Sequence, residues 1–313
     1  MLQYILRKLL FSIPVIIGVS ILVFLMIHLI PGDPARIAAG INASTEQVEQ
    51  MRELLGLNKP LHIQYFDFVR GALTGDFGRS LRTKRQISSE LAGRIPCTFQ
   101  LSILALTFAT TFGVILGVLS AAFRGTIIDN LTMIGALFGL SMPSFWRGLM
   151  LILLFSFTLG WFPASGYKGP FWTAEGLRHL ALPAISLGMA YTGTLARLTR
   201  SNMLEVLGKE YIRTARSKGV KERIVFFKHA LRNALISVIT VIGLSLGILF
   251  GGAMITETVF SLPGVGSLGV TAILSRDYRM VQVIVLMMAV VFVILNLIVD
   301  IIYSLLDPRI KYE

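Results

Sequence analysis

The one place in this chain where a nucleotide-binding loop could begin is the pair Gly208-Lys209. A phosphate-binding loop needs Ser or Thr directly after its lysine and a glycine five residues before its second glycine. Here Glu210 follows the lysine, and Met203 stands where the first glycine should be. We therefore expect that the chain does not bind and hydrolyse ATP itself.

No other catalytic constellation is present in the sequence. There is no His-Glu-x-x-His motif, no nucleophile elbow and no pair of carboxylates within an apolar segment. The single cysteine, Cys97, excludes an internal disulfide and a cysteine-based metal cluster. We interpret the scattered histidines as interfacial or packing residues, so the sequence predicts a chain that is not an enzyme and holds no metal. The four histidines are His28, His62, His179 and His229.

Two charged residues lie within apolar segments. Arg147 follows Pro143 by four residues, and an arginine inside a membrane span costs roughly 2.5–3.5 kcal/mol on insertion scales. Its side chain either reaches the outer interface beside Trp146 or makes a structural pairing, or it lines a wet cavity and meets an anionic group of a substrate. Arg147 is therefore a candidate substrate-facing residue, whereas Asp300, near the end of the last apolar segment, is interpreted as an end-capping or packing residue.

Composition defines the class of protein. Of 313 residues, 54% are hydrophobic and 15% are charged, and the mean hydropathy is +0.74, whereas a soluble domain averages roughly 25% charged residues. The chain is therefore expected to be a polytopic membrane protein. Its net charge of +12 comes from basic residues between apolar segments, which indicates membrane topology and anionic lipid rather than nucleic acid as the partner.

The apolar segments predict an all-α integral membrane protein with six transmembrane helices. A helix needs roughly 20 apolar residues to cross the hydrocarbon core. The third expected span is interrupted by Arg147. The six expected spans are 9–30, the uncharged interval between Arg94 and Arg124, 130–160, the interval between His179 and Arg197, 233–256 and 280–303.

Basic residues in the short loops predict orientation, because lysine and arginine favour the cytoplasmic side. Six spans place the N-terminal Arg7-Lys8, Arg124, the 201–232 loop and the C-terminal tail on that side. Both termini are then cytoplasmic. The expected division is residues 1–30 (N-terminal tail and first span), 31–96 (external segment) and 97–313 (five-helix core with a cytoplasmic loop at about 201–233).

The external segment is expected to fold. Ser44 and Gln47 fit a capping box, and Gly56 fits the end of the helix that follows. A second short helix is expected over 61–73. The segment is either a small lid on the membrane bundle or a surface for an external partner.

Glycines four residues apart predict close helix packing in lipid. Ordinary packing within the chain is the favoured interpretation, and a sliding or subunit interface is the alternative. The pairs and triplet are Gly113/Gly117, Gly135/Gly139 and Gly243/Gly247/Gly251.

Residues 210–233 read EYIRTARSKGVKERIVFFKHALRN, a dense basic segment between two apolar runs. A helix over 203–217, in which Leu207, Tyr211 and Ala215 recur every four residues, a turn at Gly219 and a second helix over 221–233 are expected. Such a unit is either a docking surface for a soluble partner or a basic face on lipid head groups.

This segment resembles the EAA motif of permease subunits in bacterial ATP-binding-cassette importers, in the form typical of the dipeptide, oligopeptide and nickel permeases. The general motif is Glu-Ala-Ala, three residues, Gly, nine residues, then Ile-x-Leu-Pro. The chain keeps Ala215, Gly219 and Leu231. It departs at Arg213, Thr214, His229 and Arg232, as the peptide-permease variant does.

Other stretches resemble the same family in the same order along the chain. One departure is Arg279, which stands where a proline often follows Asp-Tyr. The matching stretches are 29–34 (Leu-Ile-Pro-Gly-Asp-Pro), 55–61, 75–80, the segment Glu257 to Gly266, Arg276-Asp277-Tyr278 and Asp307-Pro308-Arg309.

The resemblance implies the type I importer permease fold, in the bacterial cytoplasmic (inner) membrane. It implies partners: a second homologous permease, two cytoplasmic ATPases that use ATP and Mg²⁺, and an external solute-binding protein, with no cofactor bound directly by this chain. It also implies two sets of site residues. The ATPase-coupling residues are Glu210, Tyr211, Arg213, Thr214, Ala215, Gly219 and Leu231, and those of the external gate are Glu257, Pro263, Gly264 and Asp277.

The expected function is to form half of the import pathway for small peptides, such as dipeptides, oligopeptides or glutathione-like peptides. Import of nickel or a metal chelate is the alternative within the family. An autonomous secondary carrier is less well supported, because it would need ionisable residues deep in its spans and would not need a docking loop.

Overall fold

The computed structural model describes residues 2–29, 33–40 and 42–306. Within these ranges every regular element is a helix, apart from one isolated bridge between Arg79 and Gln86. The chain forms two compact units, residues 1–98 with 263–294 (unit 1) and residues 99–262 with 295–313 (unit 2). The prediction of an all-helical architecture is confirmed for the described residues.

Unit 1 contains α1 (Leu2–Leu29), α2 (Pro34–Ala39), α3 (Thr45–Leu54), α4 (Leu61–Thr74), the start of α5 (Ile87–Ala122), α12 (Val265–Leu274) and most of α13 (Tyr278–Leu306). Its hydrophobic core forms where α5, α12 and α13 meet. Ile87 of α5, Val265 and Leu268 of α12, and Met280 and Ile284 of α13 are all buried there. The core therefore joins two parts of the chain that are far apart in sequence.

The two short helices expected after the first apolar run are present as α3 and α4. The Gln47 N–H donates to Ser44 Oγ at 3.3 Å, and the Ser44 N–H donates to Gln47 Oε1 at 3.0 Å, which completes the predicted capping box. Gly56 follows α3 with a φ of +68°, a conformation that favours glycine. The apolar face of α3 is only partly covered, since Leu54 remains exposed.

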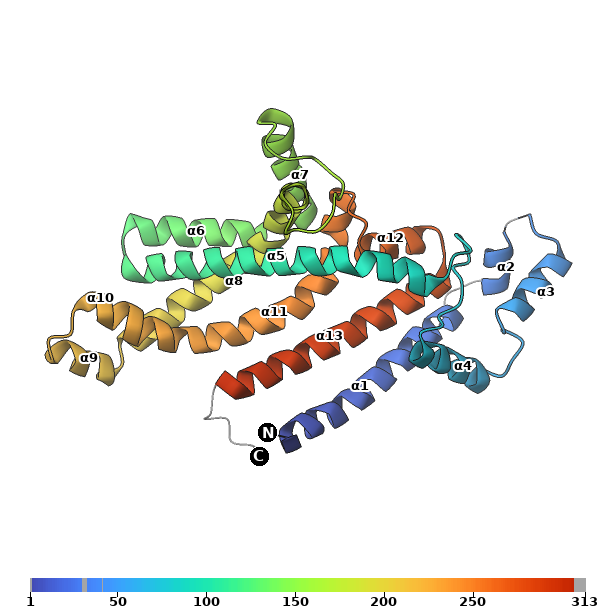
Figure 1. The fold of residues 1–313 in the computed structure, drawn as a ribbon, viewed down its shortest axis with the longest axis horizontal. Coiled ribbons are helices and arrows are strands. Elements are labelled where there is room, and N and C mark those ends of the chain that lie inside the picture. The colour runs from blue at the N-terminus through green and yellow to red at the C-terminus, as the bar shows by residue number, and fades with distance from the viewer. Residues whose placement is uncertain (1, 30–32, 41, 307–313) are drawn as a thin grey trace. The chain divides into compact units, whose positions relative to one another are not determined.

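Unit 2 contains the rest of α5, α6 (Ile127–Ser141), α7 (Ser144–Leu151), the π-helical η1 (Ile152–Thr158), α8 (Ala174–Leu207), α9 (Glu210–Ser217), α10 (Glu222–Ile224), the π-helical η2 (Val225–Leu231), α11 (Arg232–Val259) and the end of α13. Figure 1 shows α5, α6 and α8 side by side, with α9 and α10 at the end of this unit away from α7.

Four of the described helical segments are long and apolar enough to cross a membrane, or five if α6 and α7–η1 count as one bent span. The four are Arg7–Met26, Ile87–Ala122, Glu222–Val259 and Tyr278–Ile301. The expected fourth span lies in α8, which has 34 residues but is less apolar than these helices. The structure thus confirms a protein with several apolar helices, and the count of six stays a prediction.

The expected third span, 130–160, consists of two helical segments, α6 and α7–η1, rather than one continuous helix. The chain bends by 109° between α6 and α7–η1. The break falls at Met142, which has an extended backbone (φ −72°, ψ 135°) because the following Pro143 disfavours the helical conformation for the residue before it. Arg147 lies within the new helix, α7.

Some predicted features lie outside the described residues: 30–32 of the first family-like stretch and Asp307-Pro308-Arg309 with the rest of the C-terminal tail. The division at residue 96 is a statement about topology, which the compact units do not test.

Glycine packing places α8 directly against α5 and α6. A Cβ at Gly117 would lie 2.6 Å from the Ala196 carbonyl oxygen, and a Cβ at Gly193 would lie 2.3 Å from the Ala136 carbonyl oxygen. Real Cβ atoms do not approach this closely, so only glycine lets these backbones touch. The prediction of close packing is confirmed for Gly113, Gly117, Gly139 and Gly243, whereas Gly135 and Gly251 have no atom within 4 Å of an added Cβ.

We expect Gly193→Ala to destabilise the protein by roughly 1–3 kcal/mol, because the new methyl group would collide with the α6 backbone. Gly135→Ala, on α6 itself, is the matched control and should leave stability unchanged, since its Cβ meets open space. Thermal unfolding of the two variants in detergent measures the difference. Equal stability of the two would show that α6 and α8 do not touch at Gly193.

Candidate functional site

The basic segment forms a helical hairpin with one buried face. Ile212 of α9 is fully buried against Met203 of α8 and against Val225 and Ala230 of η2. Glu210 lies in the first turn of α9, where its negative charge interacts favourably with the positive end of the helix dipole. The remaining α9 side chains except Ala215 are exposed. The helix therefore presents a polar face to the outside and packs against the rest of the unit through an apolar face.

One correction concerns the start of this hairpin. The expected helix over 203–217 is broken, since α8 ends at Leu207 and α9 begins at Glu210. Lys209 between them is extended (φ −72°, ψ 149°), and the preceding Gly208 has a low intrinsic preference for helix. The break lets α9 turn away from the axis of α8.

The turn after α9 is the predicted one. Gly219 has a φ of +74°, and its N–H donates to the Arg216 carbonyl at 2.9 Å. The Val220 N–H donates to the Ala215 carbonyl at 3.2 Å, which closes the end of the helix. A residue with a side chain would be strained at this φ, so glycine is required by the backbone.

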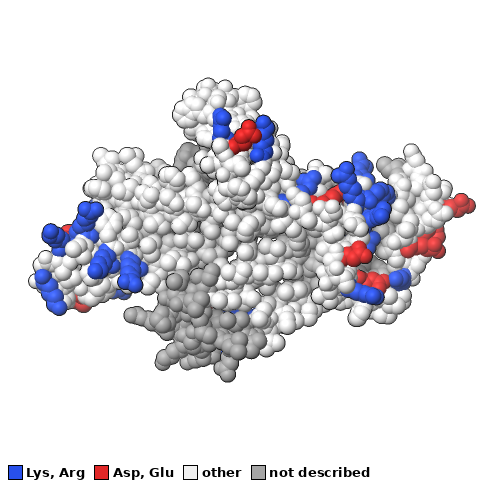
Figure 2. All heavy atoms as spheres, viewed as in Figure 1, with Lys and Arg blue, Asp and Glu red and all other residues white. Residues whose placement is uncertain are grey.

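Charge gathers on this hairpin. Figure 2 shows Lys and Arg side chains over α9 and α10, next to an almost uncharged surface over α5 and α6. Arg216 donates to Glu222 at 2.5 Å and Lys209 to Glu205 at 2.7 Å. These hydrogen bonds raise the pKa of Arg216 and the pKa of Lys209, so both groups stay charged. Such exposed pairs contribute little to stability, because solvent screens them, so a partner can compete for these charges.

The predicted coupling residues divide into two groups. Ala215 and Leu231 are half-buried and pack into the cluster beneath α9, so they hold the hairpin together. Tyr211 is exposed, and its hydroxyl oxygen accepts a hydrogen bond from Asn233 Nδ2 at 3.1 Å, which ties α9 to α11. The exposed members of the set are Glu210, Tyr211, Arg213, Thr214 and Gly219.

The predicted external-gate residues fall in both units. Glu257 lies near the end of α11 in unit 2 and is fully buried. Pro263, Gly264 and Asp277 lie in unit 1, where Gly264 directly precedes α12. The structure therefore brings only the last three into one compact unit.

Asp277 has a clear structural part within unit 1. Its carboxylate accepts hydrogen bonds from Ser80 Oγ at 2.5 Å and from the backbone N–H groups of Met280 at 3.2 Å and Arg82 at 3.4 Å. It thus caps the start of α13 and holds the loop that follows α4 against it.

Arg147 closes the bend between α6 and α7. The side chain is 5% exposed, and its Nη1 donates to the carbonyls of Gly139 at 2.8 Å and Met142 at 2.7 Å, while its Nε donates to the Ser186 carbonyl at 3.2 Å. The last carbonyls of a helix have no partner within that helix, and here the arginine supplies one. This geometry favours the structural pairing, and contact of Arg147 with substrate stays a prediction.

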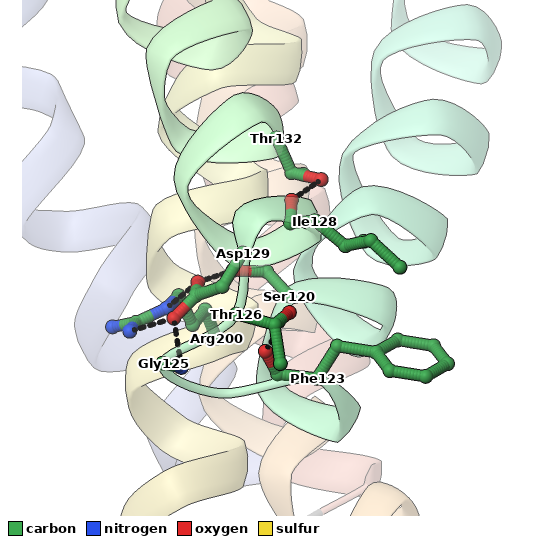
Figure 3. Close-up of polar contacts among 8 residues, drawn as sticks. All are labelled: Ser120, Phe123, Gly125, Thr126, Ile128, Asp129, Thr132 and Arg200. Carbon is green, nitrogen blue, oxygen red and sulfur yellow. Dashed lines mark hydrogen bonds and ion pairs between the residues drawn. The ribbon is translucent and has the colours of Figure 1, made fainter.

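Sequence reasoning missed a buried carboxylate, Asp129. It lies in the first turn of α6, is 2% exposed and accepts four hydrogen bonds, from Ser120 Oγ, from the Gly125 N–H at 3.0 Å, and from Arg200 Nε at 2.7 Å and Nη2 at 2.8 Å. Figure 3 shows the carboxylate held between the α5–α6 turn and Arg200 of α8. The available signal was an acidic residue three positions after Thr126 of a Gly-Thr turn, where it lies in the first turn of a helix, but the expected span start near 130 assigned it to a loop.

Long apolar helices joined by a basic helical hairpin are features of an integral membrane protein. Residues 113–312 match the family described as "Binding-protein-dependent transport system inner membrane component", and residues 1–102 match the family of its N-terminal region. The chain belongs to this family, so the family predicted from the sequence motifs is confirmed.

Relatives match over the whole chain. The chain is 42% identical over 313 residues, 100% of both chains, to the glutathione transport system permease protein GsiC of Salmonella typhimurium. It is 44% identical over 333 aligned residues, again 100% of both, to the dipeptide transport system permease protein DppB of Alkalihalophilus pseudofirmus.

Solved structures show the same fold at lower identity. An inward-facing form of the MetNI methionine ABC transporter matches with a TM-score of 0.57 and 17% identity, covering 69% of this chain and 96% of that one. A crystal structure of an amino acid ABC transporter with histidines matches with a TM-score of 0.53 and 13% identity, covering 71% and 95%. The fold is therefore that of ABC transporter membrane subunits.

We expect Arg147→Met to destabilise the protein by roughly 1.5–3 kcal/mol, because two buried carbonyls and one half-buried carbonyl lose a charged donor. Arg178→Met is the matched control, since that exposed side chain bonds one carbonyl, of Trp161, at 3.0 Å. Unfolding in detergent and limited proteolysis at the 142–144 bend measure the effect. A stable Arg147→Met variant with altered uptake of anionic solutes would instead favour the substrate-facing interpretation.

Proposed function

We propose that this chain is one of two permease subunits of an ATP-driven importer of small peptides, either dipeptides, oligopeptides or glutathione-like peptides. The observation that carries this proposal is the full-length identity of 42% and 44% to permeases named for glutathione and dipeptide transport. Import of nickel or a metal chelate by the same architecture is the alternative, and uptake assays separate the two.

We propose that α9 is the element that the ATPases grip. Its exposed polar face, its basic surroundings and the sharp turn at Gly219 support this, because they leave a short rigid helix standing out from its anchor at Ile212. ATP and Mg²⁺ would be bound by the two cytoplasmic ATPases, and this chain would hold no cofactor of its own. The second permease would complete the pathway, and an external binding protein would deliver the solute.

The proposed topology has six spans, with both termini and α9 on the cytoplasmic side. α8 supplies the fourth span, and the bent pair α6 and α7–η1 supplies the third. Residues 31–96 and the group Glu257, Pro263, Gly264 and Asp277 would then face the binding-protein side. Membrane lipid surrounds the apolar helices.

The proposed cycle is a two-state equilibrium that ATP biases. ATP binding closes the ATPases and displaces α9, which opens the pathway outward, and hydrolysis resets it inward. A ligand shifts such an equilibrium only by binding one state better than the other, so contacts on α9 must differ between the two states.

Reconstitution tests the proposal directly. The chain is placed in vesicles alone, or with its second permease, the ATPases and the binding protein, and uptake of labelled glutathione, alanyl-alanine and nickel is measured. We expect uptake of a peptide only by the complete assembly and only with ATP. Peptide uptake by the chain alone would overturn the proposal in favour of an autonomous carrier.

We expect Gly219→Trp to weaken ATPase association at least tenfold while membrane insertion stays normal. Gly160→Trp is the matched control, because Gly160 also has a positive φ (+65°) and open space around its Cβ but lies after η1 rather than beside α9. Backbone strain of about 1–2 kcal/mol affects both variants alike. Co-purification of the ATPases with each variant measures the difference, and equal recovery would argue against docking at α9.

A further inference from the structure

An ion pair between the buried Asp129 carboxylate and the half-buried Arg200 lies where α8 approaches the hairpin. Arg200 lies seven residues before the end of α8 at Leu207, and its guanidinium donates hydrogen bonds to both carboxylate oxygens of Asp129. Ser120 Oγ and the Gly125 N–H satisfy the same carboxylate, so one group joins the end of α5, the start of α6 and α8.

The ion pair holds the start of α6, where Asp129 is the one fully buried side chain. α6 is described in full, and its buried residues are Asp129, Ala136 and Gly139. Asp129 is therefore the one buried residue in the first two turns of α6. Farther along α6, Ala136 packs against Gly193 of α8, and Gly139 lies close to the backbone of Met189 of α8. The rest of α6 is therefore held to α8 by backbone contact.

The same stretch of α8 is anchored to the hairpin. Met203 is fully buried in the cluster with Ile212, and Asn202 Nδ2 donates to the Ala234 carbonyl of α11 at 3.2 Å. A displacement of α9 therefore reaches α8 within one turn of Arg200. The next connection from there to α6 is the Arg200–Asp129 pair.

We propose that Asp129 and Arg200 are positioning residues for energy coupling. The ion pair locks the start of α6 to α8, so that movement of α9 carries α6 and the bend at Pro143 with it. Without the pair, α8 moves and the first two turns of α6 lag behind. This inference rests on the proposed function, in which α9 is the element that the ATPases move.

The first experiment uses the complete assembly in vesicles and measures ATP hydrolysis with and without the binding protein loaded with glutathione or alanyl-alanine. Asp129→Asn and Arg200→Gln should each lower the stimulation by loaded binding protein about fivefold or more. The double variant should be no worse than either single one, because both remove the same interaction. Arg200→Lys, which keeps the charge but not the paired donors, should retain part of the stimulation.

Loss of stability alone must not explain the result. Ile284→Ala removes a buried side chain from the core of unit 1, whereas the ion pair belongs to unit 2, and this variant serves as the control. It should lower the unfolding temperature yet keep the stimulation of the wild type. Normal stimulation in Asp129→Asn, or an equal loss in Ile284→Ala, would overturn the proposal.

A second measurement does not depend on transport. Spin labels at Ser217→Cys on α9 and Leu131→Cys on α6 are placed at exposed positions, while Cys97 is buried. The distance distribution between the labels should be narrow in the otherwise unchanged chain and clearly broader with Asp129→Asn. An unchanged width of the distance distribution would overturn the proposal that the ion pair locks α6 to α8, whatever the transport assay shows. If the binding protein does not stimulate ATP hydrolysis even in the wild-type assembly, that result counts only against the proposed function.

Discussion

The structure depends on one constraint, which is that backbone polar groups in an apolar environment must find partners within the protein. Regular helices satisfy this requirement along their length. At helix ends the backbone groups lack partners within the helix, so other groups must supply them. At the bend after α6, Arg147 supplies donors to the orphaned carbonyls. At the α5–α6 turn, Asp129 accepts the Gly125 N–H, and at the start of α13, Asp277 accepts the Met280 N–H. Three buried charges thus serve three interruptions.

This constraint explains which parts of the fold could be predicted from sequence. The capping box at Ser44 and the turn at Gly219 depend on local chemistry and are present as predicted. Several of the long apolar runs form helices long enough to cross a membrane, whereas the count of six stays a prediction. Pro143 and Gly208 are also local signals for a helix to end. Whether the helix ends there depends on which side chains bond the backbone groups that the interruption leaves without partners.

The site shows the same division between local and distant information. The exposed face of α9 followed from its pattern, whereas the half-buried state of Ala215 and Leu231 depends on packing from η2 and α8. Asp129 and Arg200 are separated by 71 residues, so no spacing rule connects them. The two side chains can meet because glycines let α8 lie against the backbones of α5 and α6, and that packing is not evident from the sequence.

The single buried residue of α9 has an evolutionary consequence. Ile212 alone among the residues of this fully described helix is buried, with Ala215 half-buried beside it and Tyr211 bonded to Asn233, so the remaining exposed positions of α9 can diverge without disturbing the bundle. In the proposed arrangement, in which the ATPases bind α9, permeases that share this bundle can therefore differ in their ATPase partners through substitutions on the exposed face alone.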